Sequence, residues 1–588
     1  MTPGLAAFIA SGCDERGWEQ SVAGALAALA AEFEVVPERG GEAAGPDRRT
    51  LLDTFDWRLH KAGLSLEYAA RSVGGELRLA DHAVNATAAV NATAAAGAAG
   101  TGTAGSTRDA DGPDAAPSAI TQPVTGWQAG RPHLMCELPD GPVSSRVGDL
   151  VVPRALLPVV TVTTSATTHR LLNEDGKTVA RLRVERPAAG GQRSGPNATV
   201  LAPRLLIIEV RGYPSPARRA ARLVSAVPGV EPAELPVFAE ALRALGRRPG
   251  DYSNKVDTAI AAGMPANQAA ATILLRLLDT IDANVAGVLA DTDTEFLHDL
   301  RVSVRRTRSA LKLFGDALTG RGGLTEDEAG FFAAELKWVG DLTTPTRDLD
   351  VHLLDFDDTA RTLSAAKPDD LEPFRTYLEQ RRRREFRLLT RGLRSPRFTE
   401  LSRGWRAKLT TVKDSNAAGA GTTARSGRGR QAAAETTGTL AAERTRTAFA
   451  KVARRGAEIT PGSPAESLHD LRKRCKELRY ALEFFAPLYD RVAQGKVVGE
   501  LKRLQDCLGE FQDTQVQIGE IRALATAMLA AGEAPAVTLL AMGEVTAGLM
   551  SRQRAAREDF DRRFAAFAGI DGQRRMSALL RGKPGGGR

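Results

Sequence analysis

Two short and nearly identical segments constrain this chain more than any other feature. Each begins with the residues His-Asp-Leu-Arg, at positions 298–301 and again at 469–472. At about 100° per residue, each histidine and the cations that follow it fall within one narrow stripe of a helix. The first cationic stripe consists of His298, Arg301, Arg305, Arg308 and Lys312, and the second of His469, Arg472, Lys476 and Arg479. Apolar residues such as Leu297, Leu300 and Val304 follow the same period, so the helix can pack on a core and still present its charges.

The similarity between the two regions extends beyond these helices. Glu335-Leu336-Lys337 recurs as Glu500-Leu501-Lys502, and Asp348 recurs as Asp513, at nearly the same distance behind each histidine. The duplicated unit therefore contains several helices. Between the copies, residues 413–436 are rich in Gly, Ala, Ser, Thr and Arg, which is typical of a flexible connection.

At these residues the sequence resembles the CHAD domain, the conserved histidine α-helical domain. The hallmark of that family is a pair of His-Asp-x-Arg helices, each with further Arg or Lys at fixed spacing, in a duplicated helical bundle. The resemblance implies an all-α bundle over 255–570, with repeats at about 285–412 and 440–570, that binds inorganic polyphosphate. We expect polyphosphate to contact both cationic stripes and four further cations: Lys337, Arg347, Lys473 and Lys502.

A linear polyanion also fits these stripes on physical grounds. A helix places side chains at i, i+3, i+4 and i+7 in a line, roughly 5–6 Å apart, and arginine offers phosphate two parallel hydrogen bonds. Nucleic acid is the runner-up partner, because non-specific phosphate contact needs only cations. Aromatic residues make up 5% of the chain and do not alternate with these cations, so the base-stacking surface of a single-strand binder is missing.

Other interpretations of the stripes stay open at this point. A charged helix face is often only solvated, and a histidine near a helix start often bonds to the backbone. His298-Asp299 and His469-Asp470 also match the dyads of metal-dependent HD phosphohydrolases, but the cations aligned behind each dyad would repel a divalent metal. We therefore expect no metal, no cofactor and no catalysis in the helical region.

Length, charge and cysteine usage add broader expectations. A chain of 588 residues exceeds the usual size of one domain. Residues 291–588 hold 51 Lys and Arg against 41 Asp and Glu, a balance of +10, whereas residues 1–290 hold 28 against 30, a balance of −2. Four scattered cysteines favour a reducing cytoplasm, and no apolar run is long enough to span a bilayer. We expect a cytoplasmic protein without membrane contact, and association with polyphosphate granules is a further expectation.

The N-terminal part has the pattern of an antiparallel sheet. A helix is predicted over 14–34, and a strand, turn, short helix and strand over 50–68, with Gly63 ending the helix. Residues 83–125 contain few large apolar side chains and are predicted to form a disordered loop. Further strands are predicted at 134–138, 159–164, 179–184 and 205–210, with a hairpin turn at Asn173-Glu174-Asp175-Gly176.

Residues 50–68 resemble the CYTH fold of the triphosphate tunnel enzymes, in which a Tyr-Asp-Thr…Leu…Ala-Gly-x-x-Leu-Arg segment follows the first strand. The resemblance implies a degenerate CYTH-like domain over 30–245. The predicted fold is thus α+β and multidomain: an antiparallel, barrel-like β domain followed by a duplicated all-α helical bundle. Five cations of the N-terminal domain are predicted as secondary anion contacts: Arg58, Lys61, Arg170, Arg181 and Arg183.

This N-terminal domain departs from the CYTH pattern where catalysis would need it. The Glu-x-Glu-x-Lys strand is not found, Glu67 replaces an arginine, and Arg211 stands where a second acid would pair with Glu209. Metal-assisted phosphoryl transfer needs acids on both sides of the triphosphate, and Glu185 is the only other acid that we can name. Triphosphatase or nucleotidyl cyclase activity is therefore the alternative function, and we expect no enzyme activity.

From about residue 255 the pattern is helical. Besides the two stripe helices, helices are predicted at 256–289, 327–339, 371–393, 397–412 and 440–457. Arg381-Arg382-Arg383-Arg384 wraps around one of these helices. Two interpretations of this run stay open, a solvated surface and a contribution to the anion site.

Overall fold

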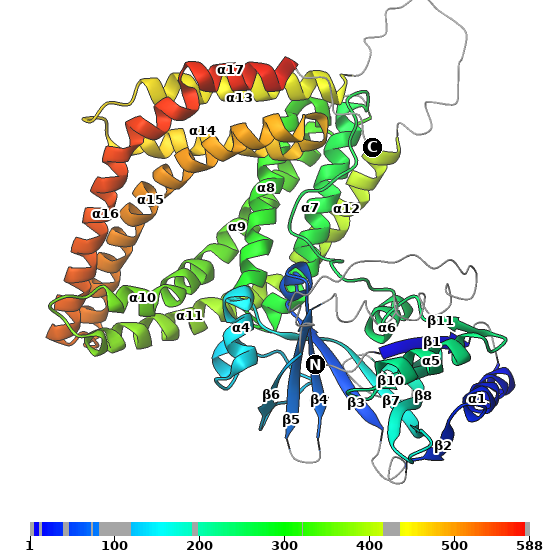
Figure 1. The fold of residues 1–588 in the computed structure, drawn as a ribbon. Coiled ribbons are helices and arrows are strands. Elements are labelled where there is room, and N and C mark those ends of the chain that lie inside the picture. The colour runs from blue at the N-terminus through cyan, green and yellow to red at the C-terminus, as the bar shows by residue number, and fades with distance from the viewer. Residues whose placement is uncertain are drawn as a thin grey trace, which may run out of the picture. The chain divides into compact units, whose positions relative to one another are not determined.

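The structure is a computed structural model that describes residues 5–10, 14–38, 46–71, 74–81, 119–190, 198–319, 322–415 and 435–581. These residues form two compact units, 1–253 and 254–588, whose elements are labelled in Figure 1. The first unit is an antiparallel sheet with helices and the second is helical. The predicted α+β class, with the sheet before the helices, is therefore confirmed.

The first unit is built on one antiparallel sheet. Its order is β11-β1-β10-β8-β7-β3-β4-β5-β6, with β2 beside β7 and β9 beside β8. The strands are β1 Leu5–Ala10, β2 Glu34–Pro37, β3 Asp47–Asp53, β4 Leu64–Ala70, β5 Gly75–Asp81, β6 Ile120–Val124, β7 Leu157–Leu172, β8 Thr178–Gly190, β9 Thr199–Val200, β10 Arg204–Glu209 and β11 Val230–Pro232. The helices are α1 Glu15–Ala30, α2 Arg58–Lys61, η1 Met135–Glu137, α4 Pro142–Val151, α5 Pro214–Ser225 and α6 Val237–Ala244.

Side chains alternate between the two faces of this sheet. On β8, Leu182 and Val184 join the buried core beneath α1 and α5. Arg181, Arg183 and Glu185 lie at the alternate positions, so they point to the opposite face, as the two-residue period of a strand requires. On this opposite face, which we call the polar face, charged residues of the strands in the middle of the sheet lie beside a small apolar cluster that includes Val162 and Ala189.

Two predictions for this unit are wrong. Residues 134–138 form the short helix η1 instead of a strand, and the ring of His133 just before it is held by the carbonyl of Gln128 and by Glu137. Strand β6 lies inside the loop predicted at 83–125, and residues 83–118 of that loop lie outside the described part of the chain. The predicted turn at 173–176 does join β7 to β8, with Gly176 at φ 71°.

The second unit contains the helices that carry both cationic stripes. They are α7 Ala266–Leu289, α8 Thr294–Thr319, α9 Glu326–Leu354, α10 Phe356–Arg361, η2 Pro368–Leu371, α11 Glu372–Leu393, α12 Pro396–Asp414, α13 Thr437–Ala457, α14 Ala465–Phe484, η4 Ala486–Leu488, α15 Arg491–Ala530, α16 Ala536–Ala568 and α17 Ile570–Arg581. The helix predicted at 256–289 begins only at Ala266, directly after Pro265, and α9 continues well beyond its predicted end at 339.

Four long helices of this unit, α8, α9, α15 and α14, form a closed frame in Figure 1. Within each half, α8 packs on α9 and α14 packs on α15. The halves meet at two corners. At one, the rings of Phe314 on α8 and Phe485 after α14 lie 5.5 Å apart. At the other, His352 Nε2 on α9 lies 2.8 Å from Glu520 Oε2 on α15, beside an apolar cluster that both helices share. We call these four helices the helix frame.

Candidate functional site

Each cationic stripe faces its neighbouring helix in the frame. On α8, Arg301 donates from NH1 to Thr344 Oγ1 (2.7 Å) and Thr343 Oγ1 (3.2 Å) of α9. On α14, Arg472 forms a two-pronged ion pair with Asp513 of α15, at 2.7 Å and 3.2 Å. The stripes are thus directed toward α9 and α15, whereas their apolar neighbours, such as Leu300, pack in the core.

The two stripes also meet each other where α8 crosses α14. Arg305 Nε of the first stripe donates to the hydroxyl of Tyr480 on α14 (2.9 Å). The pKa of Lys476 in the second stripe is lowered to about 8, mainly by burial and then by the charges of Arg472, Arg305 and Arg479. Cations from both repeats therefore lie within electrostatic reach of one another, and a bound anion would relieve their repulsion.

The two halves of the site are related by the repeat but are not identical. Thr344, which accepts from Arg301 on α9, has Gly509 as its counterpart on α15. Gly509 offers no hydroxyl to Arg472, whose NH2 lies 3.6 Å from the position that a Cβ atom would take there, an ordinary packing distance. In the first half the equivalent carboxylate, Asp348, favours the charged form of Arg301, whose pKa is lowered mainly by burial.

The remaining predicted contacts of this unit fall into three groups. Arg347 supports the fold, because it donates to the carbonyl of Thr294 (3.2 Å) and lies 3.8 Å from Glu295 at the start of α8. Lys337 and Lys473 form exposed ion pairs within their own helices, with Asp341 (2.6 Å) and Asp470 (3.3 Å). The other predicted contacts differ in burial: His298 and Arg308 are half-buried, whereas Lys312 and Lys502 are exposed. Two of them face amide side chains of α15. Arg479 lies 3.5 Å from Gln505, and His469 Nδ1 donates to Gln512 Oε1 (2.9 Å).

The five predicted cations of the first unit do not form one group. Arg58 donates to the carbonyls of Val151 and Val152 (3.0 and 2.8 Å), and Lys61 donates to the carbonyl of Asp56, so both support the chain around α2. The other three, Arg170, Arg181 and Arg183, share the polar face of the sheet, where Arg170 and Arg181 are paired in register.

The polar face also contains Arg49, which the sequence reading missed. Arg49 on β3 lies 3.5 Å from Asp47 and 3.5 Å from Glu67, and Arg183 lies 2.8 Å from Glu185. Arginines and carboxylates thus largely neutralise each other on this face. Burial raises the pKa of the Glu185 carboxyl, against the opposing effect of Arg183.

The two acids named for metal-assisted chemistry lie on opposite faces of the sheet. Glu185 is paired in register with Arg204, and Glu209 lies at odd spacing from Arg204 along β10, so alternation points Glu209 the other way. The two carboxylates therefore cannot hold one metal ion between them. Among the described residues, no group of three or more His, Cys, Asp or Glu side chains is arranged to hold a metal. Nor is any described helix both long enough and apolar enough to cross a membrane.

Comparison with known proteins assigns the helical unit. A family model described as the CHAD domain matches residues 272–522, so the helical unit carries a CHAD domain, as the repeated motif predicted. The match begins within the second unit, and the CYTH-like interpretation of the first unit stays a prediction. No curated protein is significantly similar to the chain.

Several solved structures are similar to this chain, among them the two that follow. The crystal structure of the CHAD domain from the plant Ricinus communis has 24% identity and a TM-score of 0.43, and the alignment covers 54% of this chain and 96% of that one. PptA from Streptomyces chartreusis has 17% identity and a TM-score of 0.38, with 51% and 99% covered. At these values neither similarity bears on what the chain binds.

Proposed function

We propose that the helical unit binds inorganic polyphosphate at one continuous site formed by both cationic stripes. The observation that supports this most is the meeting of the stripes, where Arg305 of α8 bonds to Tyr480 of α14. There the pKa of Lys476 is lowered by burial and by the charges of Arg472 and Arg305. Cations from the two repeats repel one another where they lie close together, and a linear polyanion can neutralise several of them at once. The CHAD assignment supports the same ligand at the family level.

We further propose that neither unit of the protein is an enzyme. The helical unit binds without catalysis, and the first unit has no turnover, because Glu185 and Glu209 face opposite sides of its sheet. Arg170, Arg181 and Arg183 on the polar face act as secondary anion contacts, whereas Arg58 and Lys61 support the fold. Nucleic acid is the alternative ligand. The protein acts in the cytoplasm, in association with polyphosphate granules.

Paired substitutions of exposed stripe residues test whether the site is continuous. Arg305→Gln and Arg479→Gln each remove one charge, from α8 and α14, and both side chains are exposed, so the fold is retained. A charge-assisted hydrogen bond is worth about 1.5–3 kcal/mol, so each variant should bind long polyphosphate roughly tenfold or more weakly. The double variant should lose both contributions, as measured by equilibrium binding with helical circular dichroism as the folding check.

Arg454→Gln with Arg554→Gln is the matched control, because it removes the same charge from exposed positions outside the stripes. A double stripe variant that binds no more weakly than this control would refute the continuous site.

A further inference from the structure

A row of four arginines lies on α11, apart from both cationic stripes. The arginine row consists of Arg384, Arg387, Arg391 and Arg394, which are all exposed. Arg394 is the C-terminal cap of α11 and keeps helical dihedral angles, so it continues the row. At helical spacing the four side chains fall within about 80° of the circumference and extend over about 15 Å of the axis.

The opposite face of α11 anchors the helix. Phe374, Leu378, Leu389 and Leu393 are buried there. Arg382 lies on the same side, where Asp350 (2.5 Å) and Asp291 (2.6 Å) hold its guanidinium. The arginines of α11 therefore have different roles. Arg382 supports the fold, and the arginine row points away from the packed face.

The arginine row lacks counter-charges within the described part of the chain. None of its four members forms an ion pair there. The helix's own Glu379 and Glu385 lie roughly 100° and 140° around the circumference from the centre of the row. On the neighbouring helix α12, three cations have an acidic partner: Arg397 with Glu335, Arg406 with Asp282 and Lys408 with Glu328. The exposed Arg403 and Lys413 of α12 form no ion pair among the described residues, but they do not make up a row of four. The row is thus available to an external anion.

We propose that the arginine row is a second contact for the same polyphosphate chain that the helix frame binds, and that it gives the protein a preference for long chains. This inference rests on the proposed function. A chain bound in the frame and long enough to reach α11 makes the second contact as an intramolecular step, which can raise the affinity by about 10²-fold or more without changing the first site. A short phosphate reaches only one of the two contacts.

The form of the row favours this ligand over others. Its members follow one another at about 4.5 and 6 Å along the axis, in a single file that suits a linear anion and the two-pronged geometry of arginine. A helix that lies in a membrane surface presents an apolar face beside its cations. The apolar face of α11 is instead buried in the protein. Leu388, at 49% exposed, is the one large exposed aliphatic side chain of α11, whose residues are all described.

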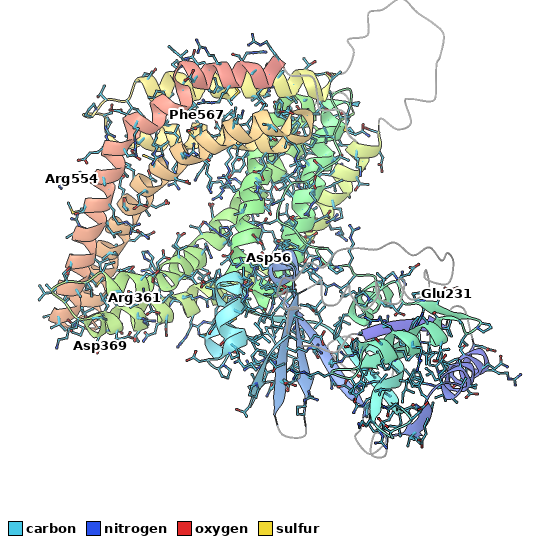
Figure 2. All side chains as sticks on the ribbon, in the orientation of Figure 1. Asp56, Glu231, Arg361, Asp369, Arg554 and Phe567 are labelled. Carbon is cyan, nitrogen blue, oxygen red and sulfur yellow. The ribbon has the colours of Figure 1, made fainter. Side chains whose placement is uncertain are left out.

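The test compares long polyphosphate with tripolyphosphate on the full chain and on the variant R384Q/R387Q/R391Q/R394Q. Affinity for long polyphosphate should fall by about 10²-fold, and the slope of log affinity against log salt should become shallower by about 3, because up to four contacts no longer release counterions. Affinity for tripolyphosphate should stay unchanged. The control R446Q/K451Q/R454Q/R554Q removes four exposed but scattered charges; Arg554 is labelled on α16 in Figure 2.

Three results would overturn the proposal. The first is an affinity for long polyphosphate no lower than that of the control variant, and the second is an equal loss for tripolyphosphate. The third is a loss of duplex DNA binding with long polyphosphate unaffected, which would make the row a nucleic-acid surface. If the unmodified chain binds neither phosphate probe, the proposed function fails and this inference fails with it, whereas a failure of the row alone leaves binding in the frame intact.

Discussion

At the scale of single residues, Lys476 is the most informative side chain of the site. Its lowered pKa of about 8 comes from burial and from Arg472, Arg305 and Arg479, and Asp513 opposes the shift. Bound phosphate adds negative charge and would raise the pKa again, so binding takes up a proton when Lys476 begins uncharged. Polyphosphate should therefore bind best below about pH 7, where Lys476 is already charged, and more weakly above about pH 8.

A pH series of binding measurements checks this prediction. Between about pH 8 and about pH 10 the affinity for long polyphosphate should fall by up to roughly tenfold per pH unit, the limit for one coupled proton. Lys476→Arg keeps its charge over this range and should flatten the profile. Identical pH profiles for the two proteins would show that Lys476 is not the group responsible.

At the scale of elements, the two halves of the helix frame hold their arginines differently. On α9, Thr344 accepts from Arg301 with a neutral hydroxyl, whereas on α15 the equivalent Gly509 has no hydroxyl and Arg472 pairs with the carboxylate of Asp513. Polyphosphate must compete with the ion pair of Asp513 for Arg472. Arg301 instead donates to the hydroxyls of Thr343 and Thr344 and to the carbonyl of Gly340, and it forms no ion pair with an acid among the described residues. The first repeat should therefore contribute more to affinity than the second.

Asp513→Asn tests this difference between the halves. The side chain of Asp513 is 63% exposed, so its ion pair with Arg472 is worth no more than about 1 kcal/mol. The variant should bind polyphosphate more tightly, by up to about fivefold. Glu510→Gln is the control, because it removes another ion-paired carboxylate of α15 whose partner, Arg552, lies outside the stripes. Weaker binding by Asp513→Asn would instead mean that Asp513 holds Arg472 in its binding position.

Features within one element could be predicted from the sequence, whereas contacts between elements could not. The helical period located both cationic stripes, because it depends only on spacing within one segment. It could not find Tyr480 as a partner of Arg305, since the two residues lie 175 positions apart and meet only when α8 crosses α14. Likewise, Glu185 and Glu209 were plausible together until the register placed them on opposite faces. The apolar run at 134–138 was too short to distinguish a strand from the short helix that forms there.

At the scale of the whole molecule, the chain combines an antiparallel sheet unit with a CHAD unit that holds most of the excess positive charge. The repeat explains why so many cations can converge without unfolding the protein. Each stripe is anchored by its own apolar face, at Leu300 in the first half and Leu471 in the second. Carboxylates and hydroxyls of α9 and α15 then hold the charged ends in place.

Equilibrium binding of the full chain to long polyphosphate and to duplex DNA, at matched phosphate concentration and increasing salt, tests the central claim most directly. Seven Arg and Lys side chains in the two stripes would release counterions from a linear polyanion, so log affinity should fall linearly with log salt. The stripes alone give a slope on the order of −5, and the arginine row steepens it by about 3. Polyphosphate should bind more tightly than DNA throughout. DNA binding that equals or exceeds polyphosphate binding, or an affinity that does not change with salt, would contradict the account.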